Sequence, residues 1–353
     1  MKAEAIYIVG LGASTAIGRD AWSSAAAVRA GISGFTQHPY MIDTAGEPMR
    51  VAIAPWLDTE LSGVERLKAL LFPAIDQVME PIVNGYFPRL RNAFFLGLPN
   101  KRPGLPDNLQ SALLKELGEK YKRAFTAIEV FSNGHAAGLF ALDAAKERLE
   151  QGLYDACVIA GVDSYIEPET LEWLEENDQL HGAGPLNNAW GFIPGEAGAA
   201  LLLMRESIAK FAGLQMLAVV LGTGTSMEPK RIKTETVCIG EGLTLAFRAA
   251  LVALPTNTVV SDIYCDMNGE PYRADEFGFT ALRTKDHFDA ASDFVAPADC
   301  WGDVAAAGGL LHVQLACAAA RKGYANGSMS FAWASSEMGD RAAALLACPV
   351  GWA

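Results

Sequence analysis

The sequence has little positive charge for its length. Its 353 residues include 28 Lys and Arg against 41 Asp and Glu, which gives a formal net charge of −13. Nucleic acids and anionic membrane surfaces repel an acidic protein, so neither is expected as a main partner.

The sequence also lacks a long hydrophobic run. The N-terminal apolar stretch Ala5–Ala13 is too short to cross a bilayer and carries two glycines, so it predicts a buried strand and no membrane insertion. In the absence of a signal peptide, we expect a cytoplasmic protein.

Cysteine motifs and nucleotide-binding loops are missing as well. The cysteines show neither C-x-x-C spacing nor a local Cys/His cluster, which predicts reduced thiols and no metal site; they are Cys157, Cys238, Cys265, Cys300, Cys317 and Cys348. Two glycine-rich stretches, GLGAST at 10–15 and GTGTS at 222–226, lack the full G-x-G-x-x-G spacing and the Walker lysine. We interpret both as tight turns between a strand and a helix, and we expect no cofactor.

What is present is an alternation of apolar runs and helical patterns. The helices are expected at 20–30, 108–121, 135–151, 167–175, 241–253, 273–284 and 304–321. The strands are expected at 5–10, 93–98, 127–131, 156–161, 196–204, 215–226, 262–267, 293–298, 328–334 and 343–350. This order predicts an α/β protein with parallel strands, right-handed crossovers and sheets covered on both faces.

The second half repeats the first in outline. QMLAVVLGTGTS (215–226) echoes AIYIVGLGAST (5–15), because an apolar strand is followed in both by Gly-x-Gly and hydroxyl residues. We predict two βαβ-rich halves related by duplication, one over 1–206 and the other over 207–353.

Three segments of the sequence resemble the β-ketoacyl-acyl-carrier-protein synthases. They are IYIVGLGASTAIGRDAWSSAAAVRAGISGF, HAAGLFALDAAKERLEQGLYDACVIAGVDS and GFIPGEAGAALLLM, in the family's order. The resemblance implies a thiolase-like fold of two duplicated βαβαβ halves forming a layered αβαβα architecture. It also implies pairing as dimers through the strand before the nucleophile, here 126–132.

The family's condensing chemistry requires a cysteine at the start of the central helix and two histidines from the C-terminal half. The cysteine position falls on His135, and the two histidine positions fall on Asn268 and Asp303. We therefore expect that the chain does not catalyse carbon–carbon condensation. Cys265 and Cys300 are close in sequence to the expected site but lack the helix N-terminal position, so both are interpreted as bystanders.

Three functions remain open. In the first, the chain is a non-catalytic partner, scaffold or accessory subunit, like the chain-length factors of polyketide synthases or thiolase-like accessory proteins of bacterial secretion systems. It would form a homodimer or a heterodimer with a related synthase. In the second, His135 oriented by Asp303, with Asn268 as an oxyanion donor, hydrolyses or transfers an acyl thioester. In the third, the chain holds an acyl ligand without chemistry.

A few other residues carry expectations. Ser132 and Asn133 are expected to cap the central helix. Glu196 is expected to hold neighbouring loop backbones, and Trp190 and Phe192 to lie in the core, the alternative being a tunnel mouth. The basic group that could dock an acidic carrier protein is interpreted as a solvated loop; it comprises Arg89, Arg91, Lys101 and Arg102.

Overall fold

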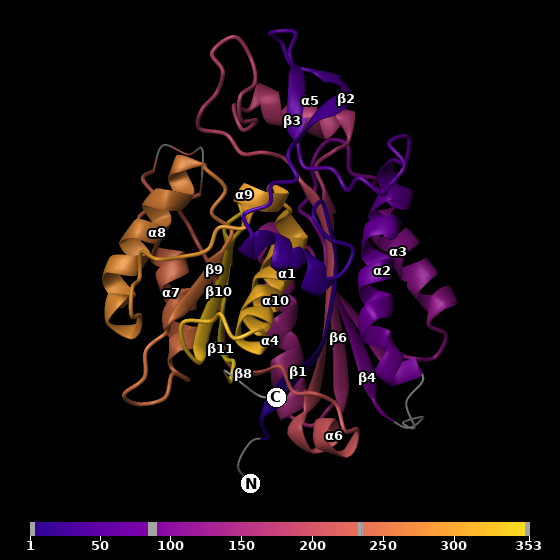
Figure 1. The fold of residues 1–353 in the computed structure, drawn as a ribbon, viewed down its shortest axis with the longest axis vertical. Coiled ribbons are helices and arrows are strands. Elements are labelled where there is room, and N and C mark those ends of the chain that lie inside the picture. The colour runs from indigo at the N-terminus through magenta and orange to yellow at the C-terminus, as the bar shows by residue number, and fades with distance from the viewer. Residues whose placement is uncertain (1–3, 84–89, 232–233, 235, 350–353) are drawn as a thin grey trace.

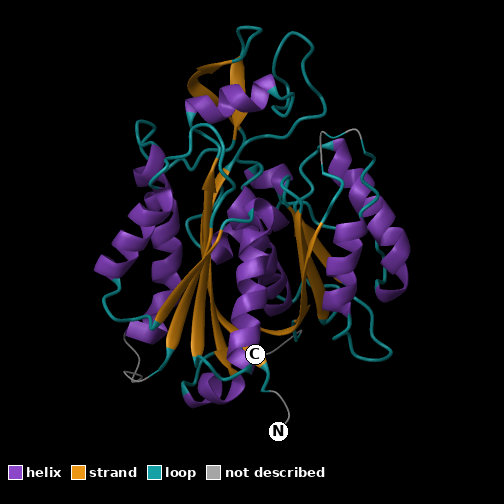
Figure 2. Ribbon diagram, turned by 180° about the vertical axis from the view of Figure 1, so that it is seen from behind, coloured by secondary structure: helices purple, strands orange, loops and turns teal. Residues whose placement is uncertain are grey.

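The chain forms five layers in the computed structural model, which describes residues 4–83, 90–231, 234 and 236–349. Helices α4 (Ala137–Glu150) and α10 (Gly308–Arg321) form the central layer, with α1 (Ala21–Arg29) beside them (Figure 1). A half of the β-sheet covers each side of this layer, and further helices cover the outer faces (Figure 2). The expected αβαβα architecture is confirmed.

The outer helices differ between the two sides. Helices α2 (Gly63–Val83) and α3 (Leu109–Lys120) cover one half of the sheet, and α7 (Glu241–Leu251) and α8 (Pro271–Thr284) cover the other. A hairpin of β2 (Thr36–Ile42) and β3 (Pro48–Val51) lies with α5 (Pro168–Glu176) at one end of the molecule. The short helices are α6 (Glu206–Phe211), α9 (Ala298–Trp301), η1 (Gly134–Ala136), η2 (Lys285–His287) and η3 (Ala305–Ala307).

One sheet of nine strands runs through both halves, in the order β5-β4-β6-β7-β1-β8-β11-β10-β9. The first half contributes β1 (Ile6–Thr15), β4 (Asn92–Gly97), β5 (Ala127–Phe131), β6 (Ala156–Ser164) and β7 (Glu196–Arg205). The second half contributes β8 (Ala218–Met227), β9 (Asp262–Cys265), β10 (Met329–Ser335) and β11 (Asp340–Ala347). The pairs β4–β5, β4–β6 and β9–β10 are parallel and the other pairs are antiparallel, so the sheet is mixed.

The strand order has the internal symmetry that a duplication would produce. In each half the first strand pairs with the last, β1 with β7 and β8 with β11. The division at residue 206 stays a prediction, because the pairing of β1 with β8 joins the two halves in one sheet.

The strand predicted at 293–298 is wrong. Only Val295 pairs there, through an isolated bridge to Tyr264 of β9. Pro297 has no N–H group to continue the ladder, and α9 begins at the next residue.

The two glycine-rich stretches are not turns. GLGAST lies inside β1 and GTGTS inside β8. A Cβ atom on Gly12 would lie 2.0 Å from the Ala74 carbonyl oxygen of α2, and one on Gly224 would lie 2.2 Å from the Ala246 carbonyl oxygen of α7. These glycines allow a helix to approach each strand closely.

Candidate functional site

The structure brings His135, Asn268 and Asp303 together around the Asp303 carboxylate. His135 lies in η1, just before α4, Asn268 lies between β9 and α8, and Asp303 lies between α9 and η3. The Nε2 atom of His135 is 3.0 Å from each Asp303 carboxylate oxygen. The Asn268 amide donates to Asp303 Oδ2 over 2.6 Å.

The backbone fixes the position of Asp303. Its N–H donates to the Ile193 carbonyl over 2.8 Å, and its own carbonyl accepts from the Gly195 N–H over 2.8 Å. The Ala305 N–H donates to Asp303 Oδ1 over 2.8 Å. Gly302 has φ of +74°, a conformation that glycine adopts without steric cost. These contacts hold the carboxylate in place.

Arg273 is the fourth member of the site, and nothing in the sequence singled it out. It lies in the first turn of α8 and is fully buried. Its guanidinium donates to Asp266 Oδ2 and to the Ser335 carbonyl, each over 2.8 Å, and its Nη2 lies 3.1 Å from His135 Nε2. Its Nε also donates to Glu270 over 3.4 Å.

The charges around His135 decide its protonation. Burial alone would lower the pKa of His135, and the Arg273 charge lowers it further, but the Asp303 charge and hydrogen bond outweigh both and raise it. The same interaction holds the pKa of Asp303 far below its usual range. One ring nitrogen cannot both donate to Asp303 and accept from Arg273. Nε2 of His135 therefore carries a proton, and this N–H group donates a hydrogen bond to Asp303.

A second buried histidine adjoins the cluster. His312 of α10 lines a cavity of about 10 Å³ together with His135, Cys265 and Asp266. Burial lowers the pKa of His312 to about 4, so this imidazole is neutral at pH 7. Cys265 also borders the cluster, but its thiol donates to the Val295 carbonyl over 3.7 Å and burial raises its pKa, which disfavours a thiolate.

A larger cavity of about 90 Å³ reaches His135 from the other side. Arg102 and Asp163 line it as a buried ion pair, and the Arg102 guanidinium lies 4.1 Å from the centre of the Tyr165 ring. Pockets that hold small-molecule ligands usually enclose about 300–1,000 Å³. Among the described residues, both cavities that contain His135 are smaller than this range.

Several expectations about single residues need correction. Neither Ser132 nor Asn133 caps the central helix; the Asn133 amide donates to Asp340 Oδ1 over 3.0 Å. Trp190 is exposed, whereas Phe192 lies in the core as expected. Glu196 holds loop backbone as expected, because it accepts from the Ala54 N–H over 2.8 Å.

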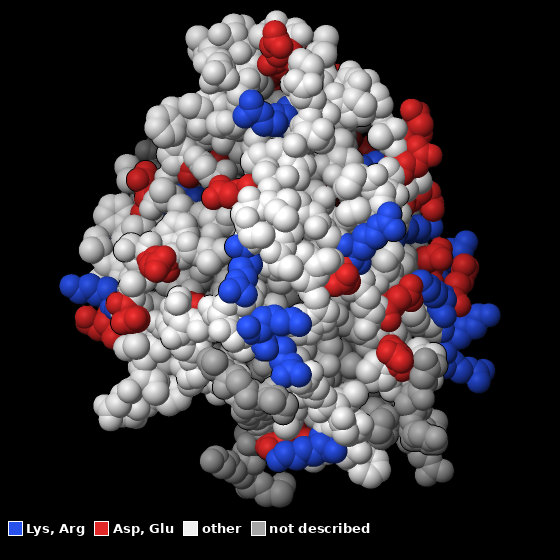
Figure 3. Space-filling model, in the orientation of Figure 1, with Lys and Arg blue, Asp and Glu red and all other residues white. Residues whose placement is uncertain are grey.

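The expectation of a solvated loop holds for part of the basic group. Lys101 and Arg91 are exposed and pair with Asp107 and Asp155, whereas Arg102 is buried against Asp163. Arg89 lies outside the described residues. On the face shown in Figure 3, acidic and basic side chains are interspersed along the flanks, and a few Lys and Arg side chains lie over its middle.

Comparisons with known proteins agree with this architecture. A model of the β-ketoacyl synthase N-terminal domain matches residues 131–209, the segment that runs from β5 through α4 and β6 to β7. A search of curated proteins finds no match for the chain. Within the part of the chain that the structure describes, no helix combines the length and the apolar character needed to span a membrane.

Solved ketosynthase structures are similar over nearly the whole chain. One belongs to AntDE:AntF, a type II polyketide synthase acyl-carrier protein in complex with its ketosynthase bound to the hexaketide. It has a TM-score of 0.77 and 14% sequence identity, and the match covers 98% of this chain and 100% of that chain. A second is the ketosynthase from module 6 of the bacillaene synthase of Bacillus subtilis 168. It has a TM-score of 0.77 and 13% sequence identity, and the match covers 99% of this chain and 73% of that chain.

A third solved structure is a ketosynthase (ApeO) in complex with its chain length factor (ApeC) from Xenorhabdus doucetiae; TM-score 0.75, 16% identity, 98% of each chain. At such identities the likeness shows the fold and not the activity. The chain has the thiolase-like fold of the ketosynthases, and its sequence resemblance to the β-ketoacyl synthases is supported over residues 131–209.

Proposed function

We propose that the chain is a ketosynthase-like subunit that does not catalyse condensation and acts as the partner of a second ketosynthase-like chain. The observation that carries this proposal is Arg273, a fully buried guanidinium that lies against His135 and fills the site with a protein cation. His135 stands where the family has its cysteine, and imidazole does not form the thioester that condensation requires. The side chains of His135, Asn268 and Arg273 all face Asp303 or one another.

The cavity volumes argue against an acyl-binding module. An acyl chain needs an apolar channel, whereas the cavities beside His135 measure about 90 Å³ and about 10 Å³. Charged side chains line both of them, and a buried charge disfavours an apolar ligand. The third function therefore has the least support.

The sheet edge supports a partner. β5 lies at one end of the nine-stranded sheet and pairs with β4 alone, and its Ile128 is 42% exposed. The opposite edge strand, β9, is covered by the segment around Val295, which exchanges backbone hydrogen bonds of 2.8 and 3.1 Å with it. An uncovered edge strand is a template for pairing with another chain. The resemblance implies an interface at this same strand, formed with another copy or with a related synthase.

A second candidate is thioester hydrolysis or acyl transfer by His135. The contact with Asp303 favours it, because a carboxylate can orient an imidazole and raise its basicity. However, Asp303 and Arg273 both face Nε2, which leaves only Nδ1 to receive a proton.

Turnover of an acyl thioester tests the proposal. We expect no thiol release from acyl-coenzyme A above the level of the His135→Ala variant, and no acylated species in the intact mass spectrum. The exposed His287 provides the matched control, His287→Ala. Turnover that survives in His287→Ala and disappears in His135→Ala would establish the enzymatic candidate instead.

A further inference from the structure

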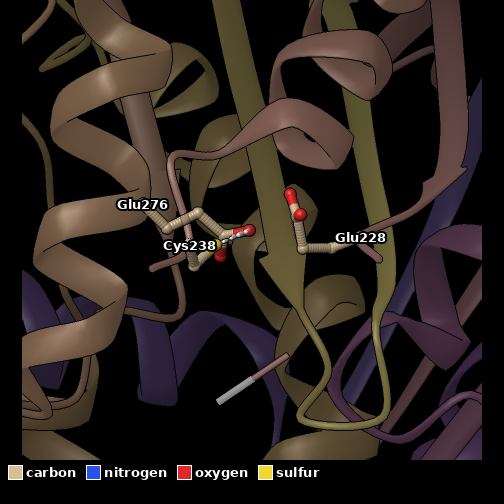
Figure 4. Close-up of side chains that lie close together, drawn as sticks. All are labelled: Glu228, Cys238 and Glu276. Atoms are coloured by element: carbon tan, nitrogen blue, oxygen red, sulfur yellow. Dashed lines mark hydrogen bonds between the residues drawn. The ribbon is translucent and has the colours of Figure 1, made fainter. Parts of the chain in front are cut away.

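Three potential metal ligands that are separated in the sequence lie close together in the structure. Glu228 follows β8, Cys238 lies in the loop before α7, and Glu276 lies on α8 (Figure 4). One ligand atom from each residue lies within 4.8 Å of the other two. The Cys238 thiol is directed at Glu276 Oε1 over 3.9 Å.

The buried charge of this cluster is not balanced. Glu228 and Glu276 are both fully buried, and Arg341 pairs with Glu276 through a 2.5 Å hydrogen bond from its Nε to Glu276 Oε1. Among the described residues, Glu228 accepts from two backbone N–H groups, that of Lys230 over 3.1 Å and that of Gly242 over 2.7 Å. Two buried carboxylates against one guanidinium leave a net negative charge, which is costly inside a protein unless a cation is present.

A buried oxygen atom also lacks a partner here. Among the described residues, neither Glu276 Oε2 nor the Ser335 hydroxyl oxygen makes a hydrogen bond. Such a buried orphan oxygen costs about 1–3 kcal/mol or more when the group is charged. A metal ion bound by Glu276 would use this oxygen while Oε1 keeps its bond to Arg341.

We infer that Glu228, Cys238 and Glu276 form a site for a divalent metal ion of borderline softness, with Zn²⁺ the best match. Thiolate together with carboxylate ligands favours zinc over the harder Mg²⁺ and Ca²⁺. Ligand atoms around tetrahedral zinc are roughly 3.3–3.8 Å apart, from bond lengths of about 2.0–2.3 Å. Side-chain movements of about 1 Å would therefore bring the three ligand atoms, which now lie within 4.8 Å of one another, to the spacing that zinc requires.

The fourth ligand and the access route come from solvent. Cys238 is partly exposed, so a metal ion can reach the cluster past it and retain one water molecule. Binding releases the thiol proton to solvent, because the thiolate is the ligand. The site joins α8, the end of β8 and the loop before α7, and Glu276 is one helical turn from Arg273. The metal would therefore anchor the helix that carries Arg273.

The test uses the full chain, stripped with a chelator and then titrated with Zn²⁺ and, separately, with Co²⁺. We expect one Zn²⁺ per chain by equilibrium dialysis, and a near-ultraviolet thiolate-to-Co²⁺ charge-transfer band. Cys238→Ser should abolish the band. Both Cys238→Ser and Glu228→Gln should weaken Zn²⁺ binding at least tenfold. Cys300→Ser is the matched control and should change neither measurement.

Two results would overturn the inference. One is less than one Zn²⁺ per chain at a tenfold molar excess of metal over protein. The other is Zn²⁺ binding that Cys238→Ser leaves unchanged, which would be adventitious binding elsewhere. The partial exposure of Cys238 makes loss of folding in Cys238→Ser unexpected, and circular dichroism verifies this. The outcome does not depend on whether His135 is catalytic.

Discussion

The Nη2 atom of Arg273 lies 3.1 Å from His135 Nε2, the nitrogen that also faces both oxygens of Asp303 at 3.0 Å. The Arg273 guanidinium and the His135 imidazole are thus placed against one carboxylate, with Asp266 and Glu270 behind Arg273. Such an arrangement stabilises the protein only while every member is present. The cluster therefore joins the segment before α4 to the segments around α8 and α9.

Replacing Arg273 by methionine should destabilise the protein by about 3–5 kcal/mol, because Asp266 and Glu270 would be left as buried charges without their cation. Urea denaturation followed by circular dichroism measures this. Lys115→Met provides the control, because Lys115 is a largely exposed cation of α3, and a change within about 0.5 kcal/mol is expected. Equal stability of the two variants would show that the cluster is not structural.

The position of the site, but not its content, could be predicted from sequence. The patterns around His135 and Asp303 marked the starts of two central helices, and a shared fold brings those helix starts together. Arg273 escaped notice because the sequence PYRADEF has the composition of a solvated first helical turn. Its burial follows from contacts with Asp266, Ser335 and His135, which come from three other segments.

The fold shows a similar division. Strands with strong apolar character were predicted well, and β5 matches at both ends. No element was predicted between residues 31 and 92, where the structure has β2, β3 and the 21-residue helix α2. Pro73 and Pro81 lie inside α2 and weaken its sequence signal, but its buried face against β1 and β7 overrides this local preference. Tertiary packing, which a single sequence does not display, decided these residues.

His312 should make the protein sensitive to acid. Its pKa of about 4 in the folded state lies below the value of about 6.5 expected for an unfolded chain. The unfolded state therefore binds more protons between these two pH values, and stability falls as pH falls through this window, by on the order of 3 kcal/mol. His312→Gln should reduce the difference in urea midpoint between pH 7 and pH 5, whereas His287→Gln should not. An unchanged pH dependence in His312→Gln would contradict the neutral buried imidazole.

Gly12 should not tolerate a side chain. A Cβ atom there would lie 2.0 Å from the Ala74 carbonyl oxygen, so Gly12→Ala must push α2 away from β1 and should cost about 1–3 kcal/mol. Gly118→Ala is the matched control. Gly118 lies within α3, nothing would lie within 4 Å of its Cβ atom, and alanine should stabilise this helix by about 0.5–1 kcal/mol. Thermal unfolding compares the two variants, and opposite shifts are expected.

The exposed edge of β5 predicts how the chain associates. If another copy adds its β5 antiparallel to this edge, Ile128 lies inside the interface, and Ile128→Asp places a charge there on each chain. Desolvating a charge opposite its own copy should weaken dimerisation roughly ten- to hundredfold, which corresponds to about 1.4–2.8 kcal/mol. Light scattering coupled to size-exclusion chromatography should give twice the 37.6 kDa chain mass for the unmodified protein. For the variant, the mass should shift toward that of a single chain.

Leu186→Asp supplies the control for this interface, because Leu186 is 94% exposed and lies in the loop before β7, far along the chain from β5. It should leave the dimer intact. A monomeric unmodified protein that forms a complex with a related synthase, and loses it in Ile128→Asp, would assign the same edge to a heterodimer. A dimer that persists in Ile128→Asp would exclude β5 as the interface, since a buried like-charge pair at the centre of an edge-to-edge contact is incompatible with unchanged affinity.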